Sequence, residues 1–265
     1  PFAHQAGVVL DSGFSFTHAV PLWNCSPVDS AIRRVNVGGK LLTNFLKDTL
    51  SFSKLALRDE FLLCDHIKRE SCFVSSDFTC DLQLVRKGGR KRRHDHARDY
   101  VMPDGVKRIQ GQLVNPRDEE QIAPFREELK TGELQVLPLD NERFTVPELL
   151  FAPSDVGLTQ SGVAEAVAAS IEACPEAIRP VLWSNIVMCG GNVLFPGFQE
   201  RLHTELRALA PCHVDVRLHV DTDPRLTVWR GAARLATDAE FPQLCVTKAM
   251  YDEHGPDICR RMFFH

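Results

Sequence analysis

The chain has 265 residues, of which 44% are hydrophobic and 25% are charged, and its formal net charge at pH 7 is −4. This length suffices for one large domain or two small ones, each with its own core. A charge balance so close to neutral argues against a dedicated nucleic-acid binder, so that role would need a local basic patch. No apolar run approaches the roughly 18–20 residues that span a bilayer, and we expect no membrane partner.

The nine cysteines contain no C-x-x-C pair. Cys64, Cys72 and Cys80 recur every eight residues, which suits neither a zinc site nor a disulfide framework. We therefore expect reduced, mostly buried thiols in a cytosolic or nuclear protein, and no metal site.

The first predicted element is a β-hairpin in GVVLDSGFSFTHAVP, at residues 7–21. An apolar strand runs into a tight turn at Ser12 and Gly13, and a strand returns from there. The segment 35–50 then predicts a short strand that ends at glycines 38 and 39, followed by a helix with leucines at helical spacing. A second helix is predicted through residues 59–70.

Residues 85–99 form the one strongly biased stretch, and we expect an exposed loop there because such a run cannot bury itself. Its basic residues are Arg86, Lys87, Arg90, Lys91, Arg92 and Arg93. They fit a nuclear localisation signal or a loop that faces DNA or histone tails, and equally a solvated insertion without a partner. His94 and His96, beside Asp95, lack a second ligand cluster that would complete a metal site. Residues 104–136 are predicted to be polar and irregular.

A hydrophobic pattern returns at residues 139–151 and is followed by a helix that starts at Thr159 or Ser161 and stops before Pro175. Residues 185–209 then predict a strand, a glycine turn and a helix from about Gly197. A further strand is predicted at 213–220, where apolar and polar residues alternate. Repeated strand–glycine–helix units place the chain in the α/β class.

Two glycine-containing turns could carry chemistry. The Asp11 carboxylate at a strand end could hold a hydrated Mg²⁺, while the amides of Ser12 and Gly13 face a phosphate. Gly190 and Gly191 let a backbone turn sharply into a helix whose N-terminus attracts anions. The alternatives are a hairpin turn with an Asx cap and a tight strand-to-helix turn without ligand.

Several motifs occur in the order and approximate spacing of the actin superfamily, from about residue 7 to the C-terminus. They are DSGFSFTHAVP, VNVGGKLLT, NERFTVPELLFAPS, CGGNVLFPGFQERL, TVWRGA and YDEHGPDICRRMF. The chain therefore resembles that superfamily, and within it a nuclear branch of the actin-related proteins. The resemblance implies an α/β actin-like (ribonuclease H-like, or actin-ATPase) fold with an incomplete two-lobed architecture. Because the chain starts at Pro1 with a strand-like segment close behind, we expect a C-terminal part of a longer protein.

The resemblance also implies a domain organisation. Residues 1–37 and 159–226 correspond to the inner part of the second actin lobe. Residues 38–158 correspond to its outer part, with a basic and polar insertion at about 85–136. Residues 227–265 correspond to a return segment to the first lobe.

The nucleotide-binding residues that the resemblance implies lie in five stretches of the chain. They are Asp11, Ser12, Gly13, Gly39, Lys68, Gly190, Gly191, Leu194, Phe195 and Arg225. ATP is the implied ligand, in a structural role.

The chain departs from the family pattern where actin holds its metal and its ribose. Phe14 stands where actin has a second aspartate beside the hydrated metal, Arg69 stands where a glutamate binds the ribose, and Asn36 replaces an aspartate. His18 matches the histidine that positions the attacking water. Because phosphoryl transfer needs metal, water and charge clamps together, we expect no catalytic residues and no efficient ATP hydrolysis.

The resemblance implies a non-enzymatic nuclear scaffold in a chromatin-remodelling complex that exchanges a variant histone into nucleosomes. Its partners would be other subunits of that complex, with histones or nucleosomal DNA as further contacts, and we expect no filaments. The cytoplasm stays open as a second location. The alternatives are an ATP-hydrolysing actin-like cytoskeletal or sugar-kinase-like protein and a defective splice or gene-model product.

Overall fold

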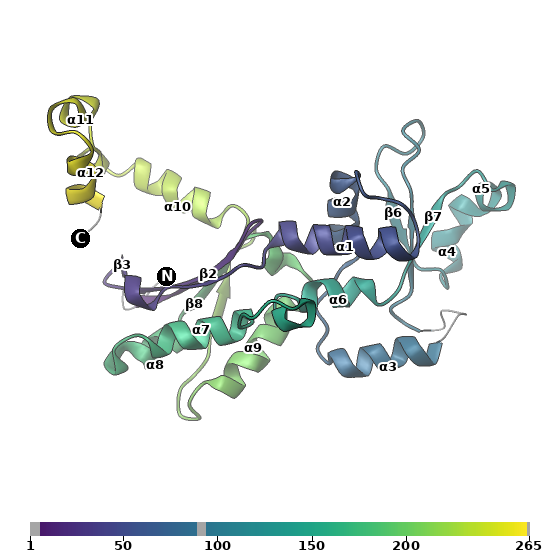
Figure 1. Cartoon of the computed structure of the whole chain (residues 1–265), viewed down its shortest axis with the longest axis horizontal. Helices are drawn as coiled ribbons and strands as arrows, with labels where there is room; N and C mark the ends of the chain where they lie inside the picture. The colour runs from purple at the N-terminus through teal and green to yellow at the C-terminus, as the bar shows by residue number, and fades with distance from the viewer. Residues whose placement is uncertain (1–5, 89–93, 264–265) are drawn as a thin grey trace. The chain divides into compact units, whose positions relative to one another are not determined.

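The computed structural model describes residues 6–88 and 94–263. The chain forms two compact units, residues 1–224 and residues 225–265, and each is described by itself. The first unit contains both β-sheets (Figure 1). Within the described ranges, no helix is both long enough and apolar enough to cross a membrane.

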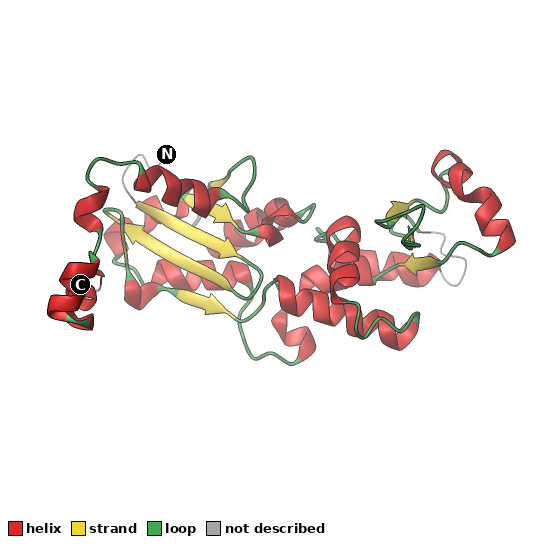
Figure 2. Cartoon of the chain, turned by 90° about the horizontal axis from the view of Figure 1, so that it is seen from above, coloured by secondary structure: helices red, strands yellow, loops and turns green. Residues whose placement is uncertain are grey.

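The larger sheet of the first unit has the strand order β3-β2-β1-β8-β9, with β4 paired to β2 (Figure 2). β1 is antiparallel to β2 and parallel to β8, and β8 is parallel to β9. The strands are β1 (Ala6–Ser12), β2 (Thr17–Trp23), β3 (Ser26–Pro27), β4 (Arg33–Val35), β8 (Ile186–Cys189) and β9 (Leu218–Val220). This mixture of parallel and antiparallel pairs with helices confirms the α/β class.

Helices cover this sheet and continue into the rest of the first unit. They are α1 (Gly39–Ser53), α2 (Phe61–Ser71), α3 (Phe78–Gly88), α4 (Glu119–Ile122), α5 (Arg126–Thr131), α6 (Glu142–Glu148), α7 (Val163–Glu172), α8 (Arg179–Trp183) and α9 (Phe198–Leu209). Short 3₁₀ turns lie before and between them, at η1 (Asp29–Ala31), η3 (Ala123–Phe125), η4 (Pro153–Val156), η5 (Glu176–Ile178) and η6 (Gly191–Leu194).

Helix α7 packs against the larger sheet, where it contacts β1, β2 and β4. Alanines on its buried face allow a close approach to the strands, and Ser170 Oγ donates to the carbonyl of Ala19. The Glu165 carboxylate caps the first turn by accepting from the Gly162 amide at 3.2 Å. The predicted helix is thus confirmed, with its start at Val163.

The two predicted helices after the hairpin are also confirmed. α1 buries Leu42, Leu46 and Leu50, which are spaced by four residues and so lie on one face. α2 packs against α1 and buries Cys64 and Ile67.

The expectation of an irregular segment at 104–136 was wrong. β5 (Arg98–Val101), β6 (Gln112–Val114) and β7 (Val136–Leu139) form a second, antiparallel sheet in the order β6-β5-β7. Val101, Val114, Phe125 and Leu134 make a small core of their own, separate from the main one. We call residues 98–139 the outer module.

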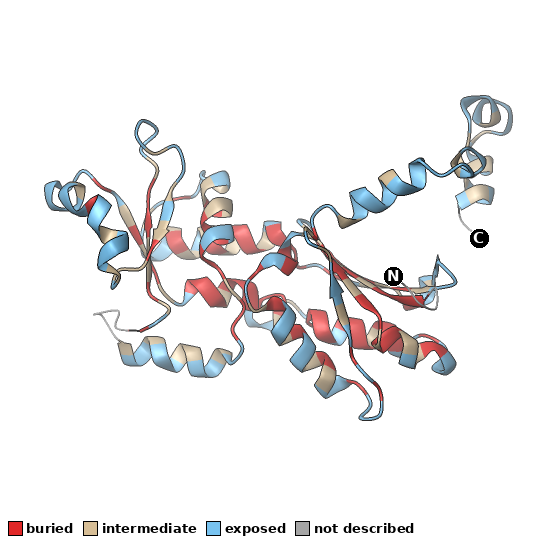
Figure 3. Cartoon of the chain, turned by 180° about the vertical axis from the view of Figure 1, so that it is seen from behind, coloured by how far each residue is buried: buried red, intermediate tan, exposed pale blue. Residues whose placement is uncertain are grey.

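The basic stretch begins inside a helix, not in a loop as predicted. Arg86 and Lys87 are exposed in the last turn of α3, which has no buried residue (Figure 3). Arg90, Lys91, Arg92 and Arg93 lie outside the described residues. The two described ends of this stretch are in contact, since a Cβ built on Gly88 would lie 2.8 Å from the His94 ring.

The strand predicted at 213–220 is shorter than expected. Only residues 218–220 form a strand, β9. Its partner β8 has four residues and pairs Ile186 with Leu218 and Met188 with Val220, so the residues before Leu218 have no strand to pair with in β8. The apolar residues of the preceding part, Val214 and Val216, pack into the main core instead.

The cysteines are free, as expected, but fewer are buried than predicted. Cys64, Cys72, Cys174 and Cys189 are buried, and the other five are partly or fully exposed. The tryptophans differ as well, since Trp183 is 3% exposed, whereas Trp229 is 67% exposed.

The second unit is helical. It contains α10 (Thr227–Ala236), η7 (Phe241–Leu244), α11 (Lys248–His254) and α12 (Pro256–Phe263). α11 and α12 pack against each other. Thr247 caps α11, since its hydroxyl accepts from the Met250 amide at 3.3 Å.

Candidate functional site

The two glycine turns singled out from the sequence lie side by side in the structure. The parallel pairing of β1 with β8 places Asp11 opposite Cys189, so the hairpin tip and the turn after β8 begin at the same sheet edge. Gly190 has φ +95°, and a Cβ at this position would lie 2.2 Å from the Ser12 carbonyl oxygen. Only glycine therefore allows the two turns to approach this closely.

Asn192 joins the two turns through its side chain. Its Nδ2 donates to Ser12 Oγ at 3.1 Å and to the Gly13 carbonyl at 2.9 Å. Ser12 Oγ also bonds Thr17 Oγ1 at 2.9 Å, and Thr17 in turn donates to the Val37 carbonyl. Because this buried network links segments far apart in the sequence, sequence reasoning did not assign Asn192 a role. The signal that could have indicated this role is the position of Asn192, a side chain with an amide group directly after two glycines.

The N-terminus of α1 is occupied by the hairpin tip. The Gly39 amide donates to the Gly13 carbonyl at 3.0 Å, and the Lys40 amide donates to the Phe14 carbonyl at 2.7 Å. A Cβ on Gly38 would lie 2.6 Å from the Ser15 carbonyl carbon. The first two amides of this helix are therefore already bonded within the protein and are not available to an anion.

The hairpin amide of Gly13 is also engaged, because it donates to the Phe16 carbonyl at 3.1 Å. The Phe14 side chain is 54% exposed and meets the ring of Phe61 edge-on, with 6.2 Å between centroids. A phenyl ring cannot bind a metal or its water shell, so this position supplies apolar surface.

Lys68 is buried, and its ammonium has three acceptors within the protein. They are Asp65 Oδ1 at 2.7 Å, Thr43 Oγ1 at 2.8 Å and the Gly39 carbonyl at 3.2 Å. An ammonium has three donors, so this set saturates it. Lys68 thereby fixes the start of α1 to α2, and sequence reasoning missed its partners Thr43 and Asp65.

Replacing Asp65 with asparagine is expected to lower the free energy of unfolding by about 1–3 kcal/mol at neutral pH, because a buried ammonium loses its carboxylate. Burial raises the pKa of Asp65, but the hydrogen bond and charge of Lys68 outweigh this, so the pKa is lower than usual. A depressed pKa gives stability that is present above the unfolded-state pKa and is lost as the pH falls through the folded-state pKa. Urea titrations of Asp65→Asn should therefore show a weaker acid dependence. If the free energy of unfolding falls at acid pH as steeply in Asp65→Asn as in wild type, the stabilising role of the pair between Asp65 and Lys68 is contradicted.

Beyond the glycine turn, three predicted residues differ in accessibility. A Cβ on Gly191 would meet nothing within 4 Å, and Leu194 is 49% exposed. Phe195 is 7% exposed and belongs to the main core. Gly191 and Leu194 thus offer open surface, whereas Phe195 is packed in the core and offers none. Arg225 is the first residue of the second unit.

The thiol under this site is not a nucleophile. Burial raises the pKa of Cys189 to about 12, helped by the charge of Asp11 and a hydrogen bond to it. Since the thiolate is the reactive form, Cys189 stays an inert thiol at neutral pH.

The residues that depart from the actin pattern are held by local contacts. Arg69 pairs with Asp65, with 3.1 Å between Nε and Oδ2. The backbone amide of Asn36 donates to Gln160 Oε1 at 2.8 Å. Nearby in the sequence, the guanidinium of Arg34 lies over the ring of Phe16. The two histidines after the basic stretch pair separately, His94 with Asp140 and His96 with Asp81.

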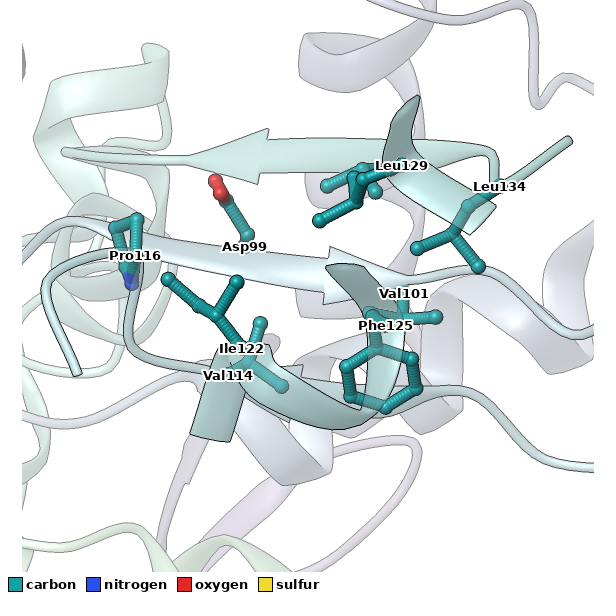
Figure 4. Close-up of a pocket in the computed structure, with 9 residues that line it drawn as sticks. Asp99, Val101, Val114, Pro116, Ile122, Phe125, Leu129 and Leu134 are labelled. Carbon is teal, nitrogen blue, oxygen red and sulfur yellow. The ribbon is translucent and has the colours of Figure 1, made fainter. Parts of the chain in front are cut away.

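The outer module contains a cavity of about 80 Å³ between its sheet and its helices (Figure 4). Val101, Val114, Ile122, Phe125 and Leu134 line it, and Asp99 is its only charged side chain. Such a lining has no pair of groups for acid–base or nucleophilic catalysis, so it offers packing surface and no chemistry.

The site fits a nucleotide only in part. Asp11, the Gly190–Gly191 turn and the exposed Leu194 leave room for a ligand, but the Gly13 amide and the Lys68 ammonium are already bonded. Sequence reasoning and structure therefore agree on which segments meet: the hairpin tip, the start of α1, the end of α2 and the turn after β8. Whether these residues bind ATP stays a prediction.

Comparison with known proteins identifies relatives along almost the whole chain. The chain is 41% identical over 274 residues to actin-related protein 6 of Arabidopsis thaliana, covering 98% of this chain and 64% of that protein. It is 41% identical over 259 residues to actin-like protein ARP6 of Yarrowia lipolytica, covering 98% and 63%. The Drosophila melanogaster actin-related protein 6 is 39% identical over 254 residues, with 94% and 60% covered.

The chain thus spans about 64% of the length of the Arabidopsis relative. The actin family model matches residues 3–65 and 53–264, which together include the hairpin tip, the Gly38–Gly39 turn and the turn after β8. The segments brought together by the fold are those in which the actin motifs occur, and the chain belongs to the actin family.

Proposed function

We propose that this chain is a non-enzymatic nuclear scaffold subunit of a chromatin-remodelling complex that exchanges a variant histone into nucleosomes. Its partners would be other subunits of that complex, histones and nucleosomal DNA. The proposal is supported by similarity to proteins named actin-related protein 6. The exposed Arg86 and Lys87, at the start of a basic run, give it a surface suited to acidic partners.

One observation carries the non-enzymatic part of this proposal. The phosphate-loop segment of the hairpin is closed on itself, because its carbonyls cap α1 and its Gly13 amide bonds Phe16. Phe14 projects from the same tip in place of an acid. With the Gly13 amide bonded internally and no acid at position 14, this segment serves as architecture and lacks charge clamps that phosphoryl transfer requires.

The direct test is the ATPase rate of the purified chain, alone and with Mg²⁺. We expect no turnover above that of a heat-denatured control. Turnover approaching that of filamentous actin would refute the scaffold proposal and favour the cytoskeletal alternative.

The proposal also includes ATP as a structural ligand, which the chain would bind without hydrolysing it efficiently. When bound, its phosphates would lie near Asp11 and Ser12, and its base near Gly191 and Leu194. These residues would orient the ligand without taking part in a reaction. Binding would stabilise the folded state by mass action, which a melting curve with added ATP measures.

The substitution Phe14→Asp is expected to increase the Mg²⁺-dependent affinity for ATP. It adds a carboxylate near Asp11 at an exposed position, so stability should change by less than about 1 kcal/mol. Calorimetric titration with ATP, with and without Mg²⁺, measures the effect, and Phe52→Asp, at a position that is 96% exposed on α1, is the matched control. Equal metal dependence in wild type and Phe14→Asp would remove the argument that this position has lost a metal ligand.

Location and partners need a separate experiment in cells. Affinity purification of the protein followed by mass spectrometry should recover a large remodelling ATPase and its associated subunits from nuclear extract. A set of cytoskeletal proteins would instead support the filament-forming alternative.

A further inference from the structure

A second hollow, of about 580 Å³, lies away from the hairpin tip. It is formed by the end of α2 and the segment after it, the start of β5, α6 and the start of α9. Ser71, Phe73, His96 and Arg143 form its inner surface, and Glu70 and Glu200 lie at its edge. None of these residues was assigned a role from the sequence.

Arg143 is the central feature of this hollow, and it is 9% exposed. Its Nε donates to the Ser71 carbonyl at 2.8 Å, and its Nη1 donates to the His96 carbonyl. Among the described residues, Nη2 has no hydrogen-bond partner and no carboxylate lies within 4 Å of the guanidinium. Three of the five N–H donors of this buried cation, one on Nη1 and two on Nη2, thus remain for a ligand.

The surroundings make this charge costly without a counter-ion. The pKa of Arg143 is lowered to about 10, chiefly by burial and then by the charge of the neighbouring Arg98, while the charges of Glu142 and Asp140 act in the opposite direction. Burial outweighs these acidic neighbours, and neither of them pairs directly with the guanidinium, so an incoming anion would gain from pairing with it.

The inner surface around Arg143 is held rigid by side-chain contacts. Its guanidinium lies 5.1 Å from the ring centroid of Phe73, and His96 stacks on that ring at 5.3 Å. His96 Nε2 lies 2.8 Å from Asp81 Oδ1, and Ser75 Oγ donates to the other oxygen of Asp81. A ligand therefore meets a prepared surface, which reduces the entropy cost of binding.

The edge of the hollow has the opposite charge. Glu70 and Glu200 are exposed, and neither forms an ion pair with a described residue, whereas Asp95 is paired with Arg117. The hollow thus has a cationic floor and an anionic edge.

From this arrangement we propose that the hollow binds a segment of another polypeptide, which places one acidic side chain on Arg143 between basic side chains that face Glu70 and Glu200. A carboxylate matches the two-donor edge of a guanidinium. A phosphate or nucleic-acid backbone carries more negative charge and would be repelled by the acidic edge. The inference goes beyond the scaffold function and does not depend on a nuclear role.

The test is calorimetric titration of the full chain with the peptide acetyl-Lys-Lys-Glu-Lys-Lys-amide at low ionic strength. Replacing the central glutamate of the peptide with glutamine should weaken binding about tenfold, since a charge-assisted hydrogen bond is lost. The protein variant Glu70→Gln/Glu200→Gln should weaken binding about threefold and reduce its salt dependence. The variant Glu172→Gln, exposed on α7 outside the hollow, should bind like wild type.

Arg143→Lys keeps the charge but removes the two-donor edge, and it should reduce the preference for glutamate over glutamine without abolishing it. If this variant misfolds, the peptide pair and the exposed double variant still decide the question. Equal affinity for both peptides in wild type would overturn the proposal. So would competition by inorganic phosphate at concentrations comparable to the peptide, because that result would identify a phosphate site.

Discussion

Replacing Gly190 with alanine is expected to lower the free energy of unfolding by about 2–5 kcal/mol, combining backbone strain with a steric clash. Its φ of +95° lies in a region that residues with a Cβ rarely adopt. The added atom would also lie 2.2 Å from the Ser12 carbonyl and 3.0 Å from Asp11 Oδ1. Because the Ser12 carbonyl belongs to the backbone and cannot rotate away like a side-chain end, the two turns would have to separate.

Gly191 provides the matched control for this substitution. Its Cβ position is open, and its φ is not positive, so Gly191→Ala should change stability by less than about 0.5 kcal/mol. Urea unfolding followed by circular dichroism compares the two variants directly. Similar midpoints for Gly190→Ala and Gly191→Ala would show that the contact between β1 and the turn after β8 is not as close as described.

Replacing Arg201 with methionine is expected to lower the free energy of unfolding by about 3–5 kcal/mol near neutral pH, because it leaves a buried carboxylate unpaired. Arg201 binds Glu148 with both terminal nitrogens, at 2.9 and 3.3 Å, and also donates to the Ser75 carbonyl. The Glu148 side chain is 5% exposed. This pair fixes α9 to α6 and to the segment after α2.

The loss in free energy of unfolding caused by Arg201→Met should depend on pH in a defined direction. Burial raises the pKa of Glu148, and Arg201 acts against this shift, so its removal raises the pKa further. A raised carboxyl pKa gives stability that is fully present below the unfolded-state pKa and is lost as the pH rises through the folded-state value.

The loss in Arg201→Met should therefore be smaller near pH 5 than near pH 8, and Arg201→Met/Glu148→Gln should recover part of it at the higher pH. Thermal and urea unfolding at several pH values measure both effects. A deficit of equal size at all pH values would place the cost in lost packing and not in an unpaired carboxylate.

The sequence predicted the elements around the candidate site well, for a physical reason. In the stretch from Ile186 to Leu209, a short apolar strand, two glycines and an amphipathic helix each carry a local signal. The same holds for the helix from Gly39, whose leucines repeat every four residues. Where one segment determines its own structure, the pattern along the chain is sufficient.

The outer module was missed because its signals are not local. β6 has three residues and α4 has four, too short for either periodicity to be recognised. Its core joins Val101, Val114, Phe125 and Leu134, which come from different elements. Contacts at long sequence separation decide this structure, and a window along the chain cannot detect them.

The candidate site shows the same limit at the level of side chains. The motifs correctly brought the hairpin tip and the turn after β8 together, but they did not show that Asn192 bonds Ser12, a residue 180 positions away. Nor did they show that Asp65 and Thr43 use the donors of Lys68. Motifs identify which segments meet, whereas the hydrogen-bond partners decide whether a donor is available to a ligand.

The contact between Gly88 and His94 has a consequence for how this protein can vary and be engineered. Because Gly88 and the His94 ring lie so close together, a connection of any length between them has almost no distance to span. Doubling the length of a flexible connection costs only about 0.6 kcal/mol in closure entropy. Tags, reporter domains or longer natural insertions should therefore be accepted between these two residues with the rest of the fold unchanged.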